Sequence, residues 1–433
     1  MTRKSGEGSL GAIVTLVGTL AAIYMVSQFL RNSVGVIAPN LAREIGLSAA
    51  EIGLLSSAFF LSFAAAQLPL GLALDRYGPR LCMIVCAVVS VIGAGLFAFA
   101  TTPAGLILAR ILMGLGTSCY LMAPLALYAK RFPPERFTTL ASVQIGVGTI
   151  GTLLVTAPLA WAAATVGWRT SFVVVGLFMG ACGILVMLVV RDDHAQDASR
   201  HHETLRESLA GIAEAARLPF VVPLFLMHLT AYSSFVFVVG LWGGPYLTHV
   251  YGYGLTARGD VLFVAALAHI IGLLVFGQVE RALRSYKIPV FTGGVVLAAL
   301  LGLIALVGKL PAWALLIWIA LLGFTAGYVT VLIANGKALL PPHLVGRGMT
   351  LLNVGTMGGT FLSQLLTGAI IGLFPTEGDA YPLIAYRVVF GVQAALLLAT
   401  CIAYLRVPDP HRIAREKAEL PVSEPAPLPP KNM

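Results

Sequence analysis

The chain has 433 residues, of which 58% are hydrophobic and only 11% are charged, and its mean hydropathy is +0.89. A soluble protein of this length would carry about a quarter charged residues, so the composition excludes a soluble enzyme and predicts a protein that crosses a membrane many times. The net charge of +9 does not indicate nucleic-acid binding, because no stretch interleaves basic and aromatic residues on a soluble domain.

Apolar stretches, divided by charged or Gly- and Pro-rich breaks, predict the membrane topology of the chain. Twelve of them are long enough to cross a bilayer. They lie near residues 11–37, 50–74, 79–100, 104–129, 137–163, 168–190, 220–249, 258–280, 287–308, 312–335, 347–374 and 381–405. We therefore expect an all-α membrane protein with twelve transmembrane helices in two six-helix bundles.

The one long polar connection lies between the sixth and seventh spans and divides the chain. We expect an N-terminal six-helix bundle over residues 1–190, a solvated cytoplasmic linker over 191–219 and a C-terminal six-helix bundle over 220–406. The charge pattern of the linker is compatible with a short amphipathic helix on the membrane surface. The Pro-rich residues 407–433 predict a disordered cytoplasmic tail.

Lysine and arginine are distributed unevenly between the two sides of the predicted bundles. One side holds most of them together with both termini, whereas the other side holds only Arg43, Arg169, Arg258 and Lys309. Because cytoplasmic loops carry an excess of Lys and Arg, we expect both termini in the cytoplasm. The short loops and the absence of an Asn-x-Ser/Thr sequon favour a multi-pass protein of a bacterial inner membrane. We expect it to lie in the lipid bilayer as a monomer.

Short sequence patterns recur in the two halves at nearly one spacing. Pro133-Pro134 before the fifth span matches Pro341-Pro342 before the eleventh, and Gly151-Thr152 matches Gly359-Thr360 at the same offset of 208 residues. The repeats are in register with the predicted helix count. They indicate two bundles related by duplication, an arrangement that is common in transporters.

The first span carries a polar stripe with an arginine. Tyr24, Ser27, Gln28 and Arg31 follow each other at three- and four-residue spacing, so they share one helix face. A guanidinium inside a membrane span costs about 2.5–3.5 kcal/mol on insertion scales and cannot lose its proton. We therefore expect Arg31 to face a protein-lined or water-filled interior and to meet an anionic group there. The alternative is that it binds backbone carbonyls or extends to the membrane interface.

The absence of acidic residues from the middles of the spans supports an anionic partner for Arg31. None of the nineteen lies in the middle of a span: Glu51 and Asp260 are at helix starts, Asp75 and Glu280 at helix ends, and the rest in loops or tails. A site for cations would need a buried carboxylate. With Arg31 as the central charge, a small anionic or zwitterionic solute is the better match.

Other polar residues inside the spans are candidates for the same interior. His228 and His269 are the candidates for proton coupling, because histidine exchanges protons near neutral pH. Each could instead be satisfied by a neighbouring helix. The further candidates for solute contact, for which packing between helices is the alternative, are Tyr120, Gln144, Tyr232, Tyr328 and Asn353.

Signals for cofactors, metals and catalysis are weak. The five cysteines all fall in apolar spans, and the three linker histidines are more typical of a solvated connection than of a metal site. Gly146-x-Gly148-x-x-Gly151 fits a dinucleotide-binding template, but it follows no strand and lies within a membrane span. We therefore expect no cofactor, no bound metal, no nucleic-acid partner and no enzymatic activity.

Two motifs connect the chain to a known family. Gly71-Leu-Ala-Leu-Asp75-Arg76-Tyr-Gly78-Pro-Arg80 follows the second span, and Arg110-Ile-Leu-Met-Gly114-Leu-Gly116 lies in the fourth. They resemble the signature loop and the Arg-x-x-x-Gly-x-Gly motif of the major facilitator superfamily. The resemblance implies a secondary transporter that works by alternating access. It also implies a gating role for Gly71, Asp75, Arg76, Gly78, Arg80 and Arg110.

Within that family the first and seventh spans are most similar to the sugar-phosphate-permease-like and organic anion symporter groups. This resemblance implies that Arg31 anchors an anionic substrate. Sugar-phosphate antiporters are expected to carry a second central arginine in the seventh span. Here Pro39 and Gly46 after the first span match Pro245 and Gly252 after the seventh at an offset of 206 residues, which places Phe237 opposite Arg31. A singly charged or zwitterionic solute is therefore favoured, with proton coupling left open. The alternatives are an exporter of neutral or amphipathic compounds or drugs, and a membrane sensor that does not transport.

Overall fold

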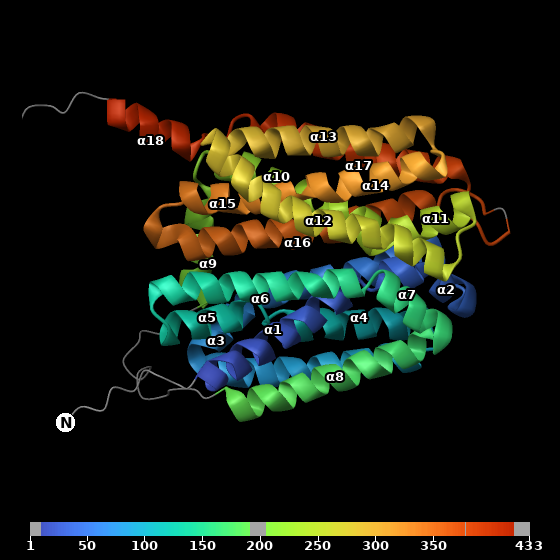
Figure 1. Cartoon of the computed structure of the whole chain (residues 1–433), viewed down its shortest axis with the longest axis horizontal. Coiled ribbons are helices and arrows are strands. Elements are labelled where there is room, and N and C mark those ends of the chain that lie inside the picture. The colour runs from blue at the N-terminus through green and yellow to red at the C-terminus, as the bar shows by residue number, and fades with distance from the viewer. Residues whose placement is uncertain (1–9, 191–204, 377, 420–433) are drawn as a thin grey trace, which may run out of the picture.

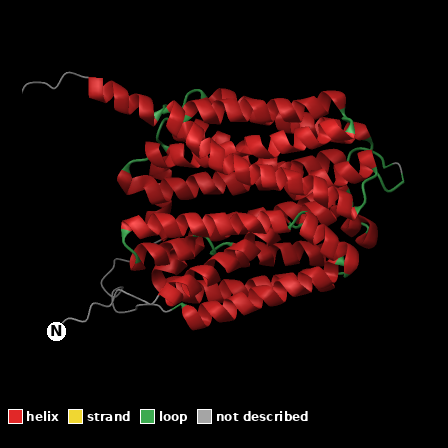
Figure 2. Cartoon of the chain, viewed as in Figure 1, coloured by secondary structure: helices red, strands yellow, loops and turns green. Residues whose placement is uncertain are grey.

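The structure is a computed structural model that describes residues 10–190, 205–376 and 378–419, and its regular elements are helices (Figure 2). The first half contains α1 (Leu10–Asn32), α2 (Val34–Ile45), α3 (Ala49–Phe99), α4 (Pro103–Thr117), α5 (Met122–Arg131), α6 (Pro134–Leu154), α7 (Ala157–Thr165) and α8 (Trp168–Val189). The linker contributes α9 (Leu205–Ala216).

The second half begins with α10 (Val221–Phe237), the π-helix η2 (Val238–Trp242) and α11 (Gly243–Tyr251). It continues with α12 (Leu255–Leu283), α13 (Lys287–Val307), α14 (Ala312–Thr325), η3 (Ala326–Tyr328), α15 (Val329–Leu339), η4 (Pro342–Leu344), α16 (Val345–Ile371), α17 (Leu383–Tyr404) and α18 (Pro410–Glu419). In Figure 1 the helices of the first half lie together below those of the second half, with α9 between them at one end.

The helices confirm the predicted twelve-span fold. Among the described residues, ten helical segments are long and apolar enough to cross a bilayer, and the bent pair α6 and α7 forms one more span. The 51-residue α3 contains two of the predicted spans, because Gly78 interrupts it with φ 79° and ψ 163°. This backbone conformation favours glycine, and Pro79 follows it directly.

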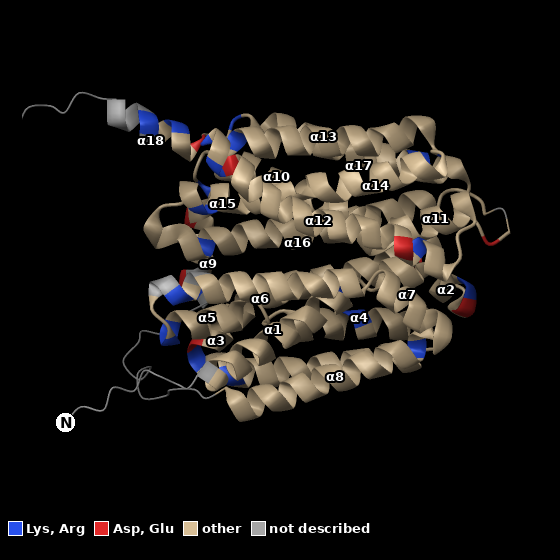
Figure 3. Cartoon of the chain, in the orientation of Figure 1, with Lys and Arg blue, Asp and Glu red and all other residues tan. Residues whose placement is uncertain are grey.

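Charged residues gather at the two ends of the molecule, and its middle is almost uncharged (Figure 3). We call the end that holds α9 and the Gly78 break the linker side, and the opposite end the far side. Large apolar side chains, such as Leu177 and Leu306, are exposed at 70% and 77% along the helices. Such a belt is what a lipid-facing surface requires, since lipid and not water would cover it.

On the far side the two halves touch closely along α2 and the η2–α11 segment. A Cβ added to Gly35 would lie only 2.7 Å from the carbonyl carbon of Gly240, and one added to Gly244 would overlap the Gly35 carbonyl oxygen. Gly53 of α3 and Gly368 of α16 pack with the same closeness. Glycines therefore bring the backbones of the two halves into contact on this side.

The chain after the last span corrects one expectation. The tail predicted to be disordered from residue 407 begins with a helix, α18, and the Asp409 carboxylate accepts a hydrogen bond from the His411 amide in its first turn. The Asp409 carboxylate also accepts hydrogen bonds from the Tyr286 and Lys287 amides, and His411 pairs with Glu280 at 2.7 Å. These contacts fix α18 to the linker-side end of α12 and α13. Residues 420–433 lie outside the described part of the chain.

Candidate substrate-binding site

A small central cavity lies between the two halves, beside Arg31. The first half contributes α1, α3 and the α4–α5 connection, and the second half contributes α16. The lining residues are Tyr24, Arg31, Phe63, Gln67, Thr117, Ser118, Leu121, Met122, Asn353 and Met357. Its volume of about 40 Å³ has room for only a few water molecules. A solute would therefore require the halves to move apart.

Arg31 brings a buried positive charge to this cavity. Its side chain is only 8% exposed, and the guanidinium lies over the Phe63 ring at 4.6 Å. Its Nε has no hydrogen-bond partner, and no carboxylate forms an ion pair with it in the described ranges. The cation–π contact offsets only about 0.5–2 kcal/mol of the desolvation of this charge. An anion in the cavity would complete its coordination.

The position of Arg31 is fixed by a break in the first span. α1 ends at Asn32 and α2 begins at Val34, which leaves carbonyls at the end of α1 without helical partners. Arg110 of α4 donates to the Leu30 carbonyl at 2.5 Å and to the Arg31 carbonyl at 3.2 Å. Arg110 is fully buried, and its guanidinium lies over the Phe59 ring. The motif arginine thus holds the backbone from which Arg31 extends.

A second break, between α4 and α5, is stabilised by side chains of neighbouring spans. Ser27 donates to the Thr117 carbonyl at 3.2 Å, and Gln67 to the Ser118 carbonyl at 3.5 Å. Gln144 donates to the Tyr120 and Leu20 carbonyls and accepts from the Tyr128 hydroxyl. Polar groups that are freed inside a span are satisfied by side chains of this kind. The chain therefore keeps an irregular, polar wall beside the cavity.

Only part of the predicted contact set meets at this cavity. Tyr24, Arg31 and Asn353 line it together. Tyr24 also lies close enough to Arg31 and Tyr232 to interact with both electrostatically. Gln28 is on the same helix, with its Oε1 buried and without a partner.

Three predicted contacts lie elsewhere. Gln144 and Tyr120 are fully buried between helices of the first half, and the Tyr120 hydroxyl reaches the Met83 carbonyl at 3.5 Å. Tyr328 is fully buried against Gly293 of α13 and the Phe276 ring. In this conformation none of these three side chains lines the cavity, because each packs against neighbouring helices of its own half.

The two candidate histidines also lie away from the cavity. His269 places Nδ1 3.2 Å from the Gly323 carbonyl and stacks on Phe235 at 4.1 Å. His228 places Nδ1 3.1 Å from the Thr356 hydroxyl, and its buried Nε2 has no partner. Thr356 is three residues after Asn353 on α16. His228 therefore contacts α16 one helical turn beyond the cavity-lining Asn353, whereas His269 is packed within the second half.

The signature loop borders a separate cavity of about 370 Å³ on the linker side. Gly71 and Asp75 of α3 line it opposite Arg347 and Thr350 of α16. Gln67 lines both this cavity and the central one, so the route from Arg31 leads toward the linker side. Arg80 donates to the Met187 carbonyl at the end of α8, and Arg76 lies over the Tyr77 ring.

Sequence reasoning missed several lining residues, among them Phe63, Gln67 and Met357. Gln67 had a usable signal, since it is an isolated amide in an apolar span. Phe63 and Met357 had none, because an apolar residue beside a polar cavity is indistinguishable in the sequence from one that faces lipid.

Comparison with known proteins gives the family. A family model described as Major Facilitator Superfamily matches residues 20–335 and 286–431. The chain therefore belongs to the major facilitator superfamily. It is a membrane transporter and not an enzyme, in agreement with the relatives and solved structures that it matches.

Among those relatives is a probable sulfoacetate transporter of Cupriavidus necator, 25% identical over 90% of this chain and 92% of that protein. A hexuronate transporter of Escherichia coli is 23% identical over 96% of this chain and 97% of its own length. A solved nucleoside transporter superposes with a TM-score of 0.71 at 12% identity over 90% of this chain and 98% of that chain, which shows the shared fold.

Proposed function

We propose that this transporter moves a small organic anion, with a carboxylate or sulfonate group, by alternating access. The observation that carries the proposal is Arg31, a buried guanidinium without a carboxylate partner in the described chain, beside a cavity between the two halves. Asn353 and Tyr24 would contribute hydrogen bonds from the same cavity. The names of the relatives, sulfoacetate and hexuronate transporters, support an acidic solute.

Two features support a single fixed charge in the site. Phe237, which the repeat places opposite Arg31, is fully buried against the ring of Phe390. Arg31 is the only basic residue among those that line the central cavity. A hexuronate, with one carboxylate and several hydroxyls, matches one guanidinium and neighbouring polar side chains better than a dianion does.

The halves would rock about this site. The glycine contacts close the far side, whereas the linker-side cavity reaches Gln67 next to the centre. We infer that the linker side is cytoplasmic, in line with its excess of Lys and Arg. The conformation described here would then face the cytoplasm. Asp75, opposite Arg347 on the linker side, would take part in closing that side when the far side opens.

Ligand-dependent thermal unfolding of the purified protein tests the substrate class. A ligand at a hundred times its Kd stabilises the folded state by about 2.7 kcal/mol. We expect galacturonate, which carries one negative charge, to raise the melting temperature of the wild-type protein, and sulfoacetate, a dianion, to raise it less. We expect galactose, which lacks the acid group, to have no effect.

The matched variants are Arg31→Gln and Arg387→Gln. Arg387 binds the Ala305 and Leu306 carbonyls, away from the cavity, so its loss should preserve the ligand effect even where it lowers basal stability. Arg31→Gln should abolish the effect. Equal stabilisation by galactose or by neutral drug-like compounds would contradict the proposal and favour an exporter of neutral solutes.

A further inference from the structure

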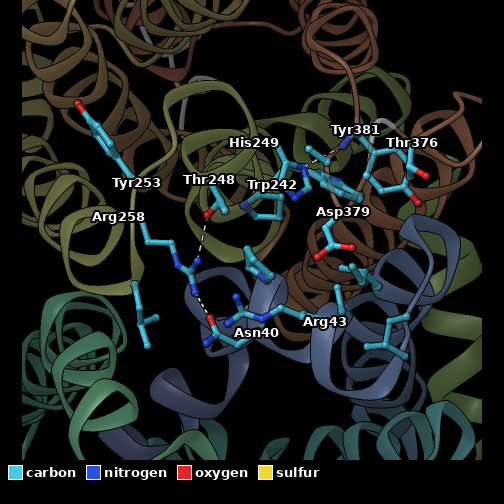
Figure 4. A pocket seen from close by; sticks show the side chains of 18 of the residues that line it. Asn40, Arg43, Trp242, Thr248, His249, Tyr253, Arg258, Thr376, Asp379 and Tyr381 are labelled. Atoms are coloured by element: carbon cyan, nitrogen blue, oxygen red, sulfur yellow. Dashed lines mark hydrogen bonds between the residues drawn. The ribbon is translucent and has the colours of Figure 1, made fainter.

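A third and larger cavity opens on the far side, separated from Arg31 by the glycine contacts between α2 and the η2–α11 segment. Its volume is about 710 Å³, enough for a small organic molecule, and both halves line it. Figure 4 shows side chains from both halves pointing into it. Its rim is open, since Arg43, Ser48 and Asp379 are exposed.

Arg258 supplies this cavity with a buried charge. The residue is 3% exposed, and its guanidinium donates to the Thr248 hydroxyl at 2.9 Å and to the Asn40 side-chain oxygen (Figure 4). Both partners are neutral. The Nε atom is buried without a partner, and none of the ion pairs of the described residues includes Arg258. A buried guanidinium with only neutral partners leaves most of its desolvation uncompensated.

Arg43 of the first half adds a second positive charge, close enough to Arg258 for the two guanidiniums to repel each other. The described lining contains one acid, Asp379, which forms no ion pair with either arginine. His249 is also present, and its Nδ1 lies 2.6 Å from the Tyr386 hydroxyl and 3.4 Å from the Tyr381 amide nitrogen.

We propose that this far-side cavity is a second anion-binding site, in which Arg258 and Arg43 hold the carboxylate or sulfonate of a small organic anion. Trp242, Tyr253 and Tyr381 form the aromatic part of its wall and would contact the organic portion. The anion would lie between the two halves before the glycine contacts open. The site would therefore concentrate anions at the far-side mouth of the transporter.

Charge-dependent thiol labelling tests the site without requiring transport. Ala42→Cys places a thiol on the first-half wall of the cavity, and Ala104→Cys places one on the exposed far-side surface outside it. The protein is held in lipid nanodiscs, where both faces meet the solution. The labelling rates of anionic sulfonatoethyl and cationic trimethylammonioethyl methanethiosulfonate are compared, with the wild-type protein as background.

We expect the anionic-to-cationic rate ratio to be at least fivefold higher at position 42 than at position 104. Adding Arg258→Gln or Arg43→Gln should lower that ratio at least threefold, whereas Arg258→Lys should largely preserve it. An unchanged ratio in folded Arg258→Gln would overturn the proposal. If Arg258→Gln does not fold, the pair Arg43→Gln and Arg258→Lys carries the same test, and an unchanged ratio in Arg43→Gln overturns it.

Protection by galacturonate or sulfoacetate separates this site from the central one. Either anion should slow labelling at position 42 at least twofold, and the protection should persist when Arg31 is replaced by Gln. Protection that disappears with Arg31→Gln would show that anions bind only at the centre, and the second site would then be rejected. Loss of transport in Arg31→Gln with persistent protection would support both proposals independently.

Discussion

At the residue scale, Arg110 contacts the first span where its helix is interrupted. Arg110 donates charge-assisted hydrogen bonds to the buried Leu30 and Arg31 carbonyls at the end of α1. Because the Arg31 side chain extends from that same backbone, the direction of its guanidinium depends on Arg110. We therefore propose that Arg110, the arginine of the family motif, positions Arg31 as the proposed substrate anchor.

Replacing Arg110 should therefore affect stability and substrate binding together. Arg110→Met removes the donor to the Arg31 carbonyl and leaves the Leu30 carbonyl with only the Ser33 hydroxyl, which should destabilise the protein by about 1–3 kcal/mol. The melting temperature without ligand would measure this loss of stability. The apparent affinity for the anion, taken from the ligand-dependent shift in melting temperature, should fall at least tenfold. Arg110→Lys retains the charge but cannot donate to both carbonyls in the same geometry, so its stability and affinity should lie between those of the wild-type protein and Arg110→Met. An Arg110→Met protein with wild-type affinity would refute the positioning role.

The sequence predicted three of the residues that line the central cavity but not the rest of its wall. Helical spacing singled out Tyr24 and Arg31, and depth within its span singled out Asn353; the structure places all three on one cavity. The same reasoning suggested Tyr328, which faces α13 instead. Spacing defines a face of one helix, whereas the neighbour that the face meets depends on the packing of twelve helices. That information is not local to any span.

At the scale of elements, glycines determine how closely the halves approach on the far side. Gly244 of α11 lies against the Gly35 backbone of α2, without room for a side chain. The π-helical turn η2 precedes this contact and shifts the register of the seventh span. The far-side closure is therefore a backbone contact that small changes in side-chain volume can disturb.

A single methyl group at this contact should favour the far-side-open state. Gly244→Ala places a Cβ against the Gly35 carbonyl, so α2 and α11 must separate. Double electron–electron resonance between spin labels at Ala104→Cys and Thr256→Cys should give a longer mean distance across the far side in Gly244→Ala than in the protein with Gly244. Gly277→Ala is the control, because no atom lies within 4 Å of its added Cβ. Identical distance distributions for Gly244→Ala and Gly277→Ala would contradict this interpretation.

Element boundaries were predictable where local chemistry determines them. Gly78-Pro79 marked the break between the second and third spans, and the structure interrupts α3 there. The helix α18 was not foreseen, because its Pro-rich surroundings indicated disorder. Its anchoring depends on Asp409 and His411 meeting residues of α12 and α13 that are more than 100 positions away in the sequence.

At the scale of the whole molecule, the cavities differ in how closely they approach the centre from each side. The linker-side cavity approaches Arg31 through Gln67, whereas the far-side cavity is sealed from it by the glycine contacts. Helix α9 lies at the linker-side opening, where Gly211 packs on the Arg347 side chain and Glu214 pairs with His343 at 3.5 Å.

The proposed cytoplasmic location of the linker side, which rests on its excess of Lys and Arg, predicts which membrane face reaches the linker-side cavity. Thr350 lines that cavity, so a membrane-impermeant maleimide should label Thr350→Cys in inverted membrane vesicles and not in intact cells. Ala104→Cys, on the far side, should show the reverse pattern. Labelling of Thr350→Cys from outside intact cells would contradict the cytoplasmic assignment of the linker side.

The central claim is that Arg31 binds the anionic group of a transported solute, and the most direct test is uptake into proteoliposomes. Radiolabelled galacturonate or sulfoacetate, whichever stabilises the wild-type protein in thermal unfolding, serves as the substrate. Arg31→Gln should reduce uptake at least a hundredfold, and Arg31→Lys should reduce it less while raising KM. Arg387→Gln should transport at a rate close to the wild-type rate. Normal anion uptake by folded Arg31→Gln would contradict the account.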